Sequence, residues 1–226
     1  MAKCVVLLSG GLDSSTAGYI AKSDGFELYA LTFKYGQKHS KEIDCAIEIG
    51  KSLNVAKHHI INFNLQDIAI SALTSNIEIP TGRTEDEMSE SIPVTYVPAR
   101  NTIFLSFALA LAESIESQDI YIGVNQVDYS GYPDCRAEYI SAFENMANLA
   151  TKAGVEGKSK YKIHTPLINM TKSEIIKLGI SLGVDYSKTW SCYKGGEYAC
   201  GECDSCKLRL NAFKSAGLED NIKYRR

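Results

Sequence analysis

Residues 5–22 read "VVLLSGGLDSSTAGYIAK": an apolar run meets two glycines and then a series of hydroxyl and carboxyl side chains. The apolar run, within residues 3–10, predicts a buried strand of a parallel sheet, and residues 13–22 predict a helix. The glycines let backbone N–H groups approach an anion, and the helix N-terminus adds a partial positive charge at the same point. This stretch therefore predicts a phosphate-binding turn between a strand and a helix.

Further strands and helices alternate along the rest of the chain. The predicted strands cover residues 26–33, 58–63, 119–124 and 161–167, and the predicted helices cover residues 39–55, 99–117, 137–154, 169–184 and 207–216. This alternation is typical of βαβ units joined by right-handed crossovers. The prediction is an α/β fold with a doubly wound, parallel, five-stranded, Rossmann-like sheet.

The composition is that of an ordinary globular protein, and the charge and apolar pattern disfavour a nucleic-acid-binding or membrane protein. The chain has 226 residues, a net charge of −3 and a pI of about 5.9, whereas domains that grip a nucleic-acid backbone are usually basic. The longest apolar run, near residues 103–112, is about half as long as a membrane span requires. No signal peptide is recognisable at the N-terminus, so we expect a cytoplasmic protein.

The sequence predicts one boundary, between residues 186 and 187, that divides the chain into two regions of different character. Residues 1–186 form the predicted nucleotide-binding domain, and residues 187–226 form a small helical appendage that contains most of the cysteines. Within the first region, residues 75–96 are polar and acidic and have no clear period. A stretch of this length without structure is often functional, so we interpret it as a flexible surface loop that could act as a lid. A solvated acidic loop without a function is the alternative.

Four cysteines lie close together near the C-terminus: Cys192, Cys200, Cys203 and Cys206. Four thiolates can close a tetrahedral zinc site, and sites of this type are typically structural. An iron–sulfur cluster is the alternative, although the ferredoxin pattern requires a further cysteine that residues 207–226 lack. Cys4, Cys45 and Cys135 are predicted to be core or loop thiols, and Trp190 is predicted to pack under the metal loop.

The phosphate-binding turn fits neither Gly-x-Gly-x-x-Gly nor Gly-x-x-x-x-Gly-Lys-Ser/Thr. Its Ser-Gly-Gly-x-Asp-Ser pattern resembles the PP-loop of the N-type ATP pyrophosphatases, which have an adenine nucleotide alpha hydrolase-like fold. The resemblance implies an ATP site with Mg²⁺ nearby, in which the turn holds the pyrophosphate and the end of the second strand lies beside the adenine. The residues implied at this ATP site are Leu8, Ser9, Gly10, Gly11, Leu12, Asp13, Ser14, Ser15, Thr16, Ala17, Gly18, Leu31, Thr32 and Phe33.

Four further segments narrow the resemblance: residues 97–113, 123–136, 165–179 and 189–213. Together with the turn they resemble the 7-cyano-7-deazaguanine synthase family of the queuosine pathway, from about residue 5 to residue 213. The resemblance implies an ATP-dependent ligase that joins ammonia to 7-carboxy-7-deazaguanine and forms a nitrile through adenylated carboxylate and amide intermediates. It also implies a homodimer, with no nucleic acid and no membrane as a partner.

Several polar residues are candidates for the substrate site. Arg100 and Asn101 stand at a predicted helix start, where they could hold an anion; a surface salt bridge is the alternative. Lys172 lies in the first turn of its helix and opposes the helix dipole, which suggests a phosphate partner; a solvated lysine is the alternative. The loop after the fourth strand is either an ordinary turn or a binding loop for a guanine-like ring, through Asp128, Tyr129, Tyr132, Asp134 and Arg136.

Two other functions remain open from the residues alone. A PP-loop enzyme that adenylates a tRNA base would require a basic RNA-binding region, and only a few scattered lysines and the terminal "KYRR" suggest one. A nucleotide sensor or scaffold with a zinc module would bind ATP without releasing pyrophosphate. The complete phosphate-binding pattern and the polar loops at the strand ends favour an enzyme over both.

Overall fold

A computed structural model describes residues 1–125 and 131–225 of the protein. Its described residues form a five-stranded sheet in the order β3-β2-β1-β4-β5, and all neighbouring strands are parallel. The strands are β1 (Lys3–Leu7), β2 (Glu27–Lys34), β3 (Lys57–Asn62), β4 (Asp119–Tyr121) and β5 (Lys162–His164). The predicted doubly wound α/β fold is confirmed.

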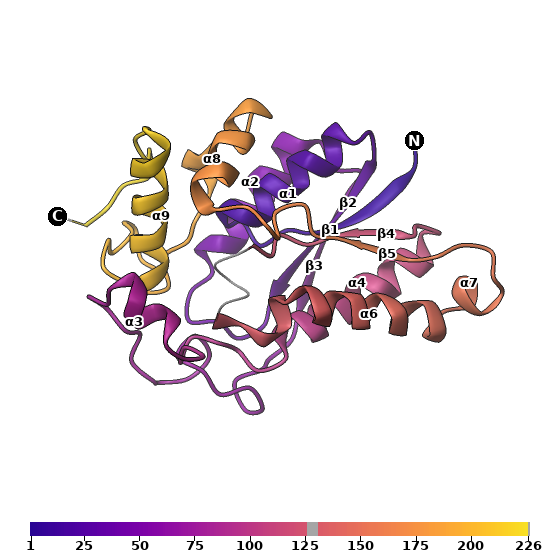
Figure 1. The fold of residues 1–226 in the computed structure, drawn as a ribbon, viewed down its shortest axis with the longest axis horizontal. Helices are drawn as coiled ribbons and strands as arrows, with labels where there is room; N and C mark the ends of the chain where they lie inside the picture. The colour runs from indigo at the N-terminus through magenta and orange to yellow at the C-terminus, as the bar shows by residue number, and fades with distance from the viewer. Residues whose placement is uncertain (126–130, 226) are drawn as a thin grey trace.

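Helices cover both faces of the sheet, as Figure 1 shows. The helices α1 and α2 lie on one face, whereas α4 and α6 lie on the other. Their bounds are α1 (Leu12–Ser23), α2 (Lys41–Leu53), α4 (Arg100–Ser114) and α6 (Ala137–Ala150). The helix α8 (Lys172–Ser181) packs beside α1, and α9 (Asp204–Ala216) packs on α8.

The central strand β1 contributes side chains to the core on both faces of the sheet, because successive side chains of a strand point to opposite faces. Val5 and Leu7 pack among residues of α4 and α6, whereas Cys4 and Val6 pack among residues of α1 and α2. An apolar side chain is therefore required at each of the four positions from Cys4 to Leu7. This explains the continuous apolar run of the sequence.

The acidic segment 75–96 is more structured than its sequence suggests. It contains the short helix α3 (Glu85–Ser89), which a reciprocal capping box between Thr84 and Glu87 begins. Figure 1 shows α3 beside α9. Arg83 forms an ion pair with Asp204 at the start of α9, and Lys207 Nζ donates to the Arg83 carbonyl over 2.8 Å. This helix has only five residues, too few for a helical hydrophobic period to be recognised in the sequence.

The single helix predicted over residues 137–154 is interrupted. The structure has α6 and then a separate short helix, α7 (Lys152–Val155), with Thr151 in an extended conformation between them. The Thr151 hydroxyl donates to the Ala147 carbonyl, and Glu113 of α4 accepts the Lys152 N–H over 2.8 Å. These side-chain partners replace the bonds that a continuous helix would make, so the chain can turn here. The short 3₁₀ helices Pro133–Cys135 and Tyr186–Lys188 precede α6 and follow α8.

A buried ion pair fastens the C-terminal tail to the helices. Arg209 of α9 forms two hydrogen bonds with Asp220, at 2.6 and 2.9 Å, and the two side chains are only 2% and 1% exposed. The same guanidinium donates to Thr189 Oγ1 and to the Tyr186 carbonyl. Removing one member of such a pair leaves the other charge buried and unpaired.

We expect Asp220→Asn to lower the free energy of unfolding by about 3–5 kcal/mol, because the Arg209 charge then lacks its partner. Urea denaturation checks this value. Glu48→Gln is the control, since Glu48 pairs with Lys51 on the exposed surface, where such a pair contributes less than about 1 kcal/mol. Equal effects of the two substitutions would contradict the prediction.

His58 connects the neighbouring strands β2 and β3. Thr32 donates its hydroxyl to the Leu8 carbonyl, so it accepts its 2.8 Å hydrogen bond from the ring Nε2 of His58. The other ring nitrogen, Nδ1, lies against Gly50, where an added Cβ would be only 2.7 Å away. Burial, followed by the charge of His59, lowers the pKa of His58 below its ordinary value.

Because the pKa of His58 is lower in the folded state, the unfolded chain binds more protons below about pH 6.5. We therefore expect stability to fall as the pH decreases from about 6.5. His58→Gln keeps a donor for Thr32 and cannot titrate, so its stability should change less over the same range. Urea denaturation from pH 7 to 5 measures the difference; parallel curves for the two proteins would contradict it.

Of the described helices, none combines the length and the apolar character needed to cross a bilayer.

Candidate functional site

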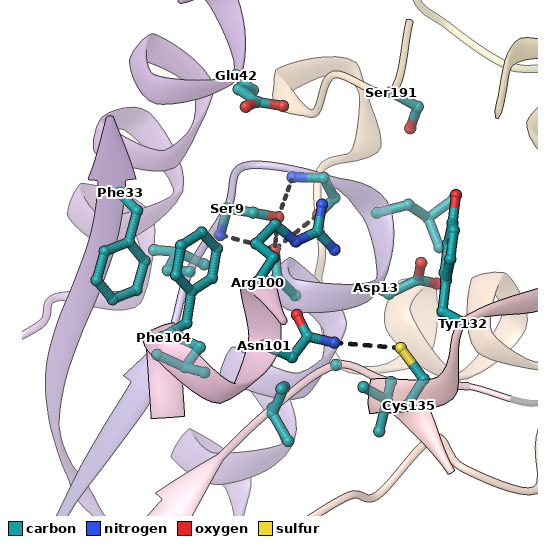
Figure 2. A pocket seen from close by; sticks show the side chains of 18 of the residues that line it. Ser9, Asp13, Phe33, Glu42, Arg100, Asn101, Phe104, Tyr132, Cys135 and Ser191 are labelled. Atoms are coloured by element: carbon teal, nitrogen blue, oxygen red, sulfur yellow. Dashed lines mark hydrogen bonds between the residues drawn. The ribbon is translucent and has the colours of Figure 1, made fainter. Parts of the chain in front are cut away.

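A cavity of about 240 Å³ opens at the carboxyl ends of β1, β2 and β4. In an open α/β sheet this edge is where ligands bind. Figure 2 shows its labelled side chains. It is lined by Leu7, Leu8, Ser9, Gly11, Leu12, Asp13, Ser14, Leu31, Phe33, Tyr35, Glu42, Leu73, Arg100, Asn101, Phe104, Ile122, Gly123, Val124, Tyr132, Cys135, Trp190, Ser191, Tyr193 and Ser205.

The predicted phosphate-binding turn forms the floor of the cavity. Ser14 Oγ accepts the Ser9 backbone N–H over 3.1 Å and lies 2.8 Å from Ser9 Oγ, so the two serines brace the turn from both ends. Gly10 has a φ of +79°, and a Cβ there would meet the Glu42 carbonyl at 2.1 Å. Only glycine fits this position, because the backbone conformation is left-handed and α2 lies against it.

Asp13 and Lys172 form an ion pair at the same turn, with 2.5 Å between Lys172 Nζ and Asp13 Oδ2. Among the described residues, the buried Oδ1 of Asp13 has no hydrogen-bond partner. Lys172 belongs to the first turn of α8, where the helix dipole disfavours a cation. Asp13 compensates for this unfavourable position and holds the ammonium group beside the predicted pyrophosphate site.

Arg100 enters the cavity from the first turn of α4. Burial acts to lower its pKa, but the neighbouring acidic groups, Tyr35 first and Asp134 next, raise it above the ordinary value. Burial in turn raises the pKa of Tyr35 to about 12. The guanidinium is therefore a permanent charge, and its buried Nε has no hydrogen-bond partner among the described residues. Such a group is suited to bind an anion.

Asn101 and Asp134 are hydrogen-bonded to each other and hold the start of α4 in place, and of the two only Asn101 lines the cavity. Asp134 Oδ2 accepts the Asn101 backbone N–H over 2.9 Å, and Asn101 Nδ2 donates to the Asp134 carbonyl and to Cys135 Sγ. Asn101, Tyr132 and Cys135 reach the cavity, whereas Asp134 is buried behind it and Arg136 is exposed at the start of α6. The candidates Asp128 and Tyr129 lie outside the described residues.

The predicted ATP residues divide into two groups. Leu8, Ser9, Gly11, Leu12, Asp13, Ser14, Leu31 and Phe33 line the cavity. Gly10, Ser15, Thr16, Ala17, Gly18 and Thr32 lie behind this lining. The hydroxyl of Thr16 bonds to Tyr186 within the core, and Gly18 packs against Leu53. These helix residues support the turn and do not face the cavity.

The four cysteines converge in one buried cluster. Their sulfur atoms all lie within 4.8 Å of one another, and Cys200 Sγ is 3.9 Å from Cys206 Sγ. Sulfur atoms around a tetrahedral zinc ion, with bonds of about 2.3 Å, would be about 3.8 Å apart. Hydrogen bonds from Cys203 and Cys206 lower the pKa of Cys192, and backbone N–H groups donate to Cys192 and Cys200. The donor set fits one tetrahedral metal ion.

The metal loop also builds a wall of the cavity. Trp190 packs in the cluster of the four cysteines, as predicted, and its backbone N–H donates to the Gly10 carbonyl over 2.9 Å. Ser191 and Tyr193, on either side of Cys192, line the cavity together with Ser205, which directly precedes Cys206. The metal ligands and the cavity lining thus alternate along the same segments.

Some lining residues were not identified from the sequence. They are Leu7, Tyr35, Glu42, Leu73, Phe104, Ile122, Gly123, Val124, Trp190, Ser191, Tyr193 and Ser205. Ser191, Tyr193 and Ser205 could have been found, because residues adjacent to metal ligands on a tight loop point away from the metal. Glu42 offers a weaker signal, a carboxylate in the first turn of the helix that follows the second strand. Leu73 carries none, since only the fold brings it here.

The fold and the site define a PP-loop protein of the ATP pyrophosphatase class. The fold is similar to NMN synthetase from Francisella tularensis, with a TM-score of 0.51, 18% identity, and coverage of 96% of this chain and 78% of that one. A predicted tRNA methyltransferase subunit from Methanocaldococcus jannaschii is also similar, with a TM-score of 0.50, 20% identity, and coverage of 100% and 93%.

Residues 3–217 match the family described as queuosine biosynthesis protein QueC, and the chain belongs to this family of enzymes. A 7-cyano-7-deazaguanine synthase from Desulfatibacillum aliphaticivorans is 59% identical over 224 residues, which cover 98% of this chain and 96% of the relative. One from Dechloromonas aromatica is 59% identical over 228 residues, covering 100% and 99%. The family resemblance of the sequence is confirmed.

Proposed function

We propose that this protein converts 7-carboxy-7-deazaguanine and ammonia into 7-cyano-7-deazaguanine, with ATP as the activating cosubstrate. Whole-length similarity to relatives of that name carries the proposal. The cavity supports it, since a phosphate-binding turn, a buried arginine and aromatic side chains meet there. A tRNA-modifying activity is the alternative, and the net charge of −3 disfavours it.

The chemistry requires two activations of the same kind. A carboxylate oxygen attacks the α-phosphorus of ATP, pyrophosphate leaves, and ammonia displaces AMP from the acyl adenylate to give an amide. The amide oxygen is then adenylated by a second ATP, and loss of AMP and a proton leaves the nitrile. Both rounds require the enzyme to position reactants and stabilise phosphate charge more than to supply a nucleophile.

The residues of the cavity suit these tasks. The turn around Ser9 and Gly11 would hold the leaving pyrophosphate through backbone N–H groups and serine hydroxyls. Arg100 would bind the α-phosphate or the substrate carboxylate. Asp13 is the residue that would hold Mg²⁺ here, because a carboxylate oxygen is the ligand that this ion prefers, and the ion would neutralise phosphate charge.

The remaining parts of the proposal concern the metal and the assembly. We assign one structural zinc ion per chain to the four cysteines, an iron–sulfur cluster being the alternative. The division into a PP-loop domain (1–186) and a metal-binding segment (187–226) stays a prediction, as do the lid role of residues 75–96, the homodimer and the cytoplasmic location. We also expect no nucleic acid or membrane partner.

A mass-spectrometric turnover assay with ATP, Mg²⁺, ammonium and 7-carboxy-7-deazaguanine tests the function. We expect the nitrile together with two AMP and two pyrophosphate for each substrate molecule consumed. An assay with unmodified tRNA in place of the deazaguanine tests the alternative. Failure of the first assay with AMP formation in the second would overturn the proposed substrate and retain the ATP chemistry.

A further inference from the structure

Glu42 is a carboxylate in the cavity wall to which the proposed reaction gives no task. It lies in the first turn of α2, partly buried. Gln37 Nε2 donates to Glu42 Oε1 over 3.0 Å and to the Phe33 carbonyl over 3.2 Å, while Gln37 Oε1 accepts the Tyr35 N–H. Gln37 thus ties the Glu42 carboxylate to the carboxyl end of β2. Burial raises the pKa of Glu42, against the opposing effects of His39, Gln37 and Arg100.

A carboxylate facing this cavity needs a positively charged or N–H-bearing partner. Phosphates and a substrate carboxylate would be repelled by it. The Mg²⁺ that accompanies the phosphates is assigned above to Asp13 at the phosphate-binding turn, so Glu42 is not needed to hold it. Asp13, the other lining carboxylate, is held by Lys172 at the phosphate-binding turn. His39 and Arg100 are the positive groups whose charges act on Glu42, and an N–H donor of a bound ligand would add a partner on the cavity side.

The surroundings of Glu42 are suited to a flat ring. Phe33 and Phe104 stack with 4.0 Å between ring centroids and 9° between planes, and Leu31, Leu73 and Tyr35 extend this apolar lining. Figure 2 shows Glu42 at the top of the view above Ser9, Phe33 at the left, and Asp13 and Tyr132 at the right. A ring stacked on this lining would share the cavity with the Glu42 carboxylate, which can accept a hydrogen bond from a polar edge of the ring.

We propose that Glu42 is a specificity residue that accepts a hydrogen bond from the exocyclic amino group of a purine-like ring. The inference rests on the proposed function, whose two ring ligands both carry such a group: the 6-amino group of adenine in ATP and the 2-amino group of the deazaguanine. Carboxylates recognise exocyclic amino groups of bases in the same way elsewhere. The hydrogen bond of Gln37 orients the carboxylate, so that Oε2 remains available to the ligand.

Binding measurements with amino-deleted ligands test the proposal without requiring turnover. Isothermal titration compares ATP with purine riboside 5′-triphosphate, both with Mg²⁺ and without cosubstrates, and compares 7-carboxy-7-deazaguanine with its 2-deamino analogue. In the unsubstituted protein, loss of the recognised amino group should weaken binding about 10- to 100-fold, the range for a hydrogen bond to a charged group. Whichever pair shows this ratio identifies the ligand.

Glu42→Gln should bring that ratio close to one. In this variant the side-chain oxygen is still occupied by Gln37, so an amide NH₂ group faces the ring and opposes another donor. Glu48→Gln is the matched control on the exposed face of α2 and should keep the original ratio. If Glu42→Gln does not fold, Glu42→Asp is the second variant. It keeps the charge but moves the carboxylate away from the ligand by one methylene group, so it should also reduce the affinity ratio.

Unchanged ratios for both ligand pairs in a folded Glu42 variant would overturn the proposal. An equal loss of affinity for amino-bearing and amino-deleted ligands would do the same, since it indicates a structural role. Because these outcomes are read from binding alone, they are distinct from a failure of the nitrile assay, which would instead overturn the proposed function.

Discussion

Asp13→Asn is expected to reduce kcat/KM for pyrophosphate release at least 100-fold while the protein stays folded. The substitution keeps the shape of the side chain but removes the charge that holds Lys172 and the carboxylate expected to bind Mg²⁺. Losing one preorganised electrostatic contact to a reacting phosphate costs about 10²–10³ in rate in other enzymes. Steady-state pyrophosphate release measures the effect, and circular dichroism and the thermal midpoint report the fold.

Ser14→Ala should act in the same direction, because Ser14 Oγ braces Ser9 across the turn. Asp44→Asn is the matched control: it changes the same charge on the exposed face of α2 and should leave turnover unchanged. Wild-type turnover of either turn variant, with an intact fold, would show that the phosphate site is wrongly assigned.

Removal of the metal is expected to lower the stability of the C-terminal segment and to weaken ligand binding in the cavity. A structural zinc ion contributes directly to folding, so we expect the metal-free protein to unfold about 10 °C lower or more. Ser191, Tyr193 and Ser205 alternate with the ligands, so binding of the deazaguanine should weaken at temperatures where the chain remains folded. Chelation followed by calorimetry and substrate titration measures both effects.

Cys203→Ser should reproduce the metal-free state, whereas Cys45→Ser, which alters a thiol outside the four-cysteine cluster, should not. Elemental analysis of protein purified without oxygen should find one zinc ion per chain. A brown, iron-containing sample would contradict the zinc assignment, and a metal-free variant with unchanged stability would contradict a structural role.

Strand boundaries illustrate where sequence patterns were sufficient and where they were not. The predicted third strand, residues 58–63, differs from β3 by one residue at each end. The predicted fourth strand, residues 119–124, is twice as long as β4 (Asp119–Tyr121). Ile122, Gly123 and Val124 continue the apolar pattern but form the cavity wall instead. A Cβ at Gly123 would lie 2.8 Å from the Ser14 backbone nitrogen, so this glycine permits a close approach to the phosphate turn.

For the helices too, local sequence signals were sufficient for some features and not for others. The capping box of Thr171 and Glu174 at the start of α8 is a local signal, because its two residues are three positions apart in the chain. The partner of Lys172 in that helix is Asp13, 159 residues away, and no local pattern could identify it. The break at Thr151 also depends on a distant residue, Glu113, which accepts the Lys152 N–H.

The sequence by itself predicted the parallel α/β sheet, the glycine turn between β1 and α1, and the convergence of the four cysteines, all of which the structure has. Each is signalled by a pattern of residues near one another in the chain: continuous apolar runs, glycines before a helix, and cysteines a few residues apart. Only the tertiary structure decided which polar residues share the cavity. It brought Glu42 into the cavity lining, and it placed Arg100 beside Tyr35 and the metal loop against Gly10, because long-range packing of strands and helices sets those distances.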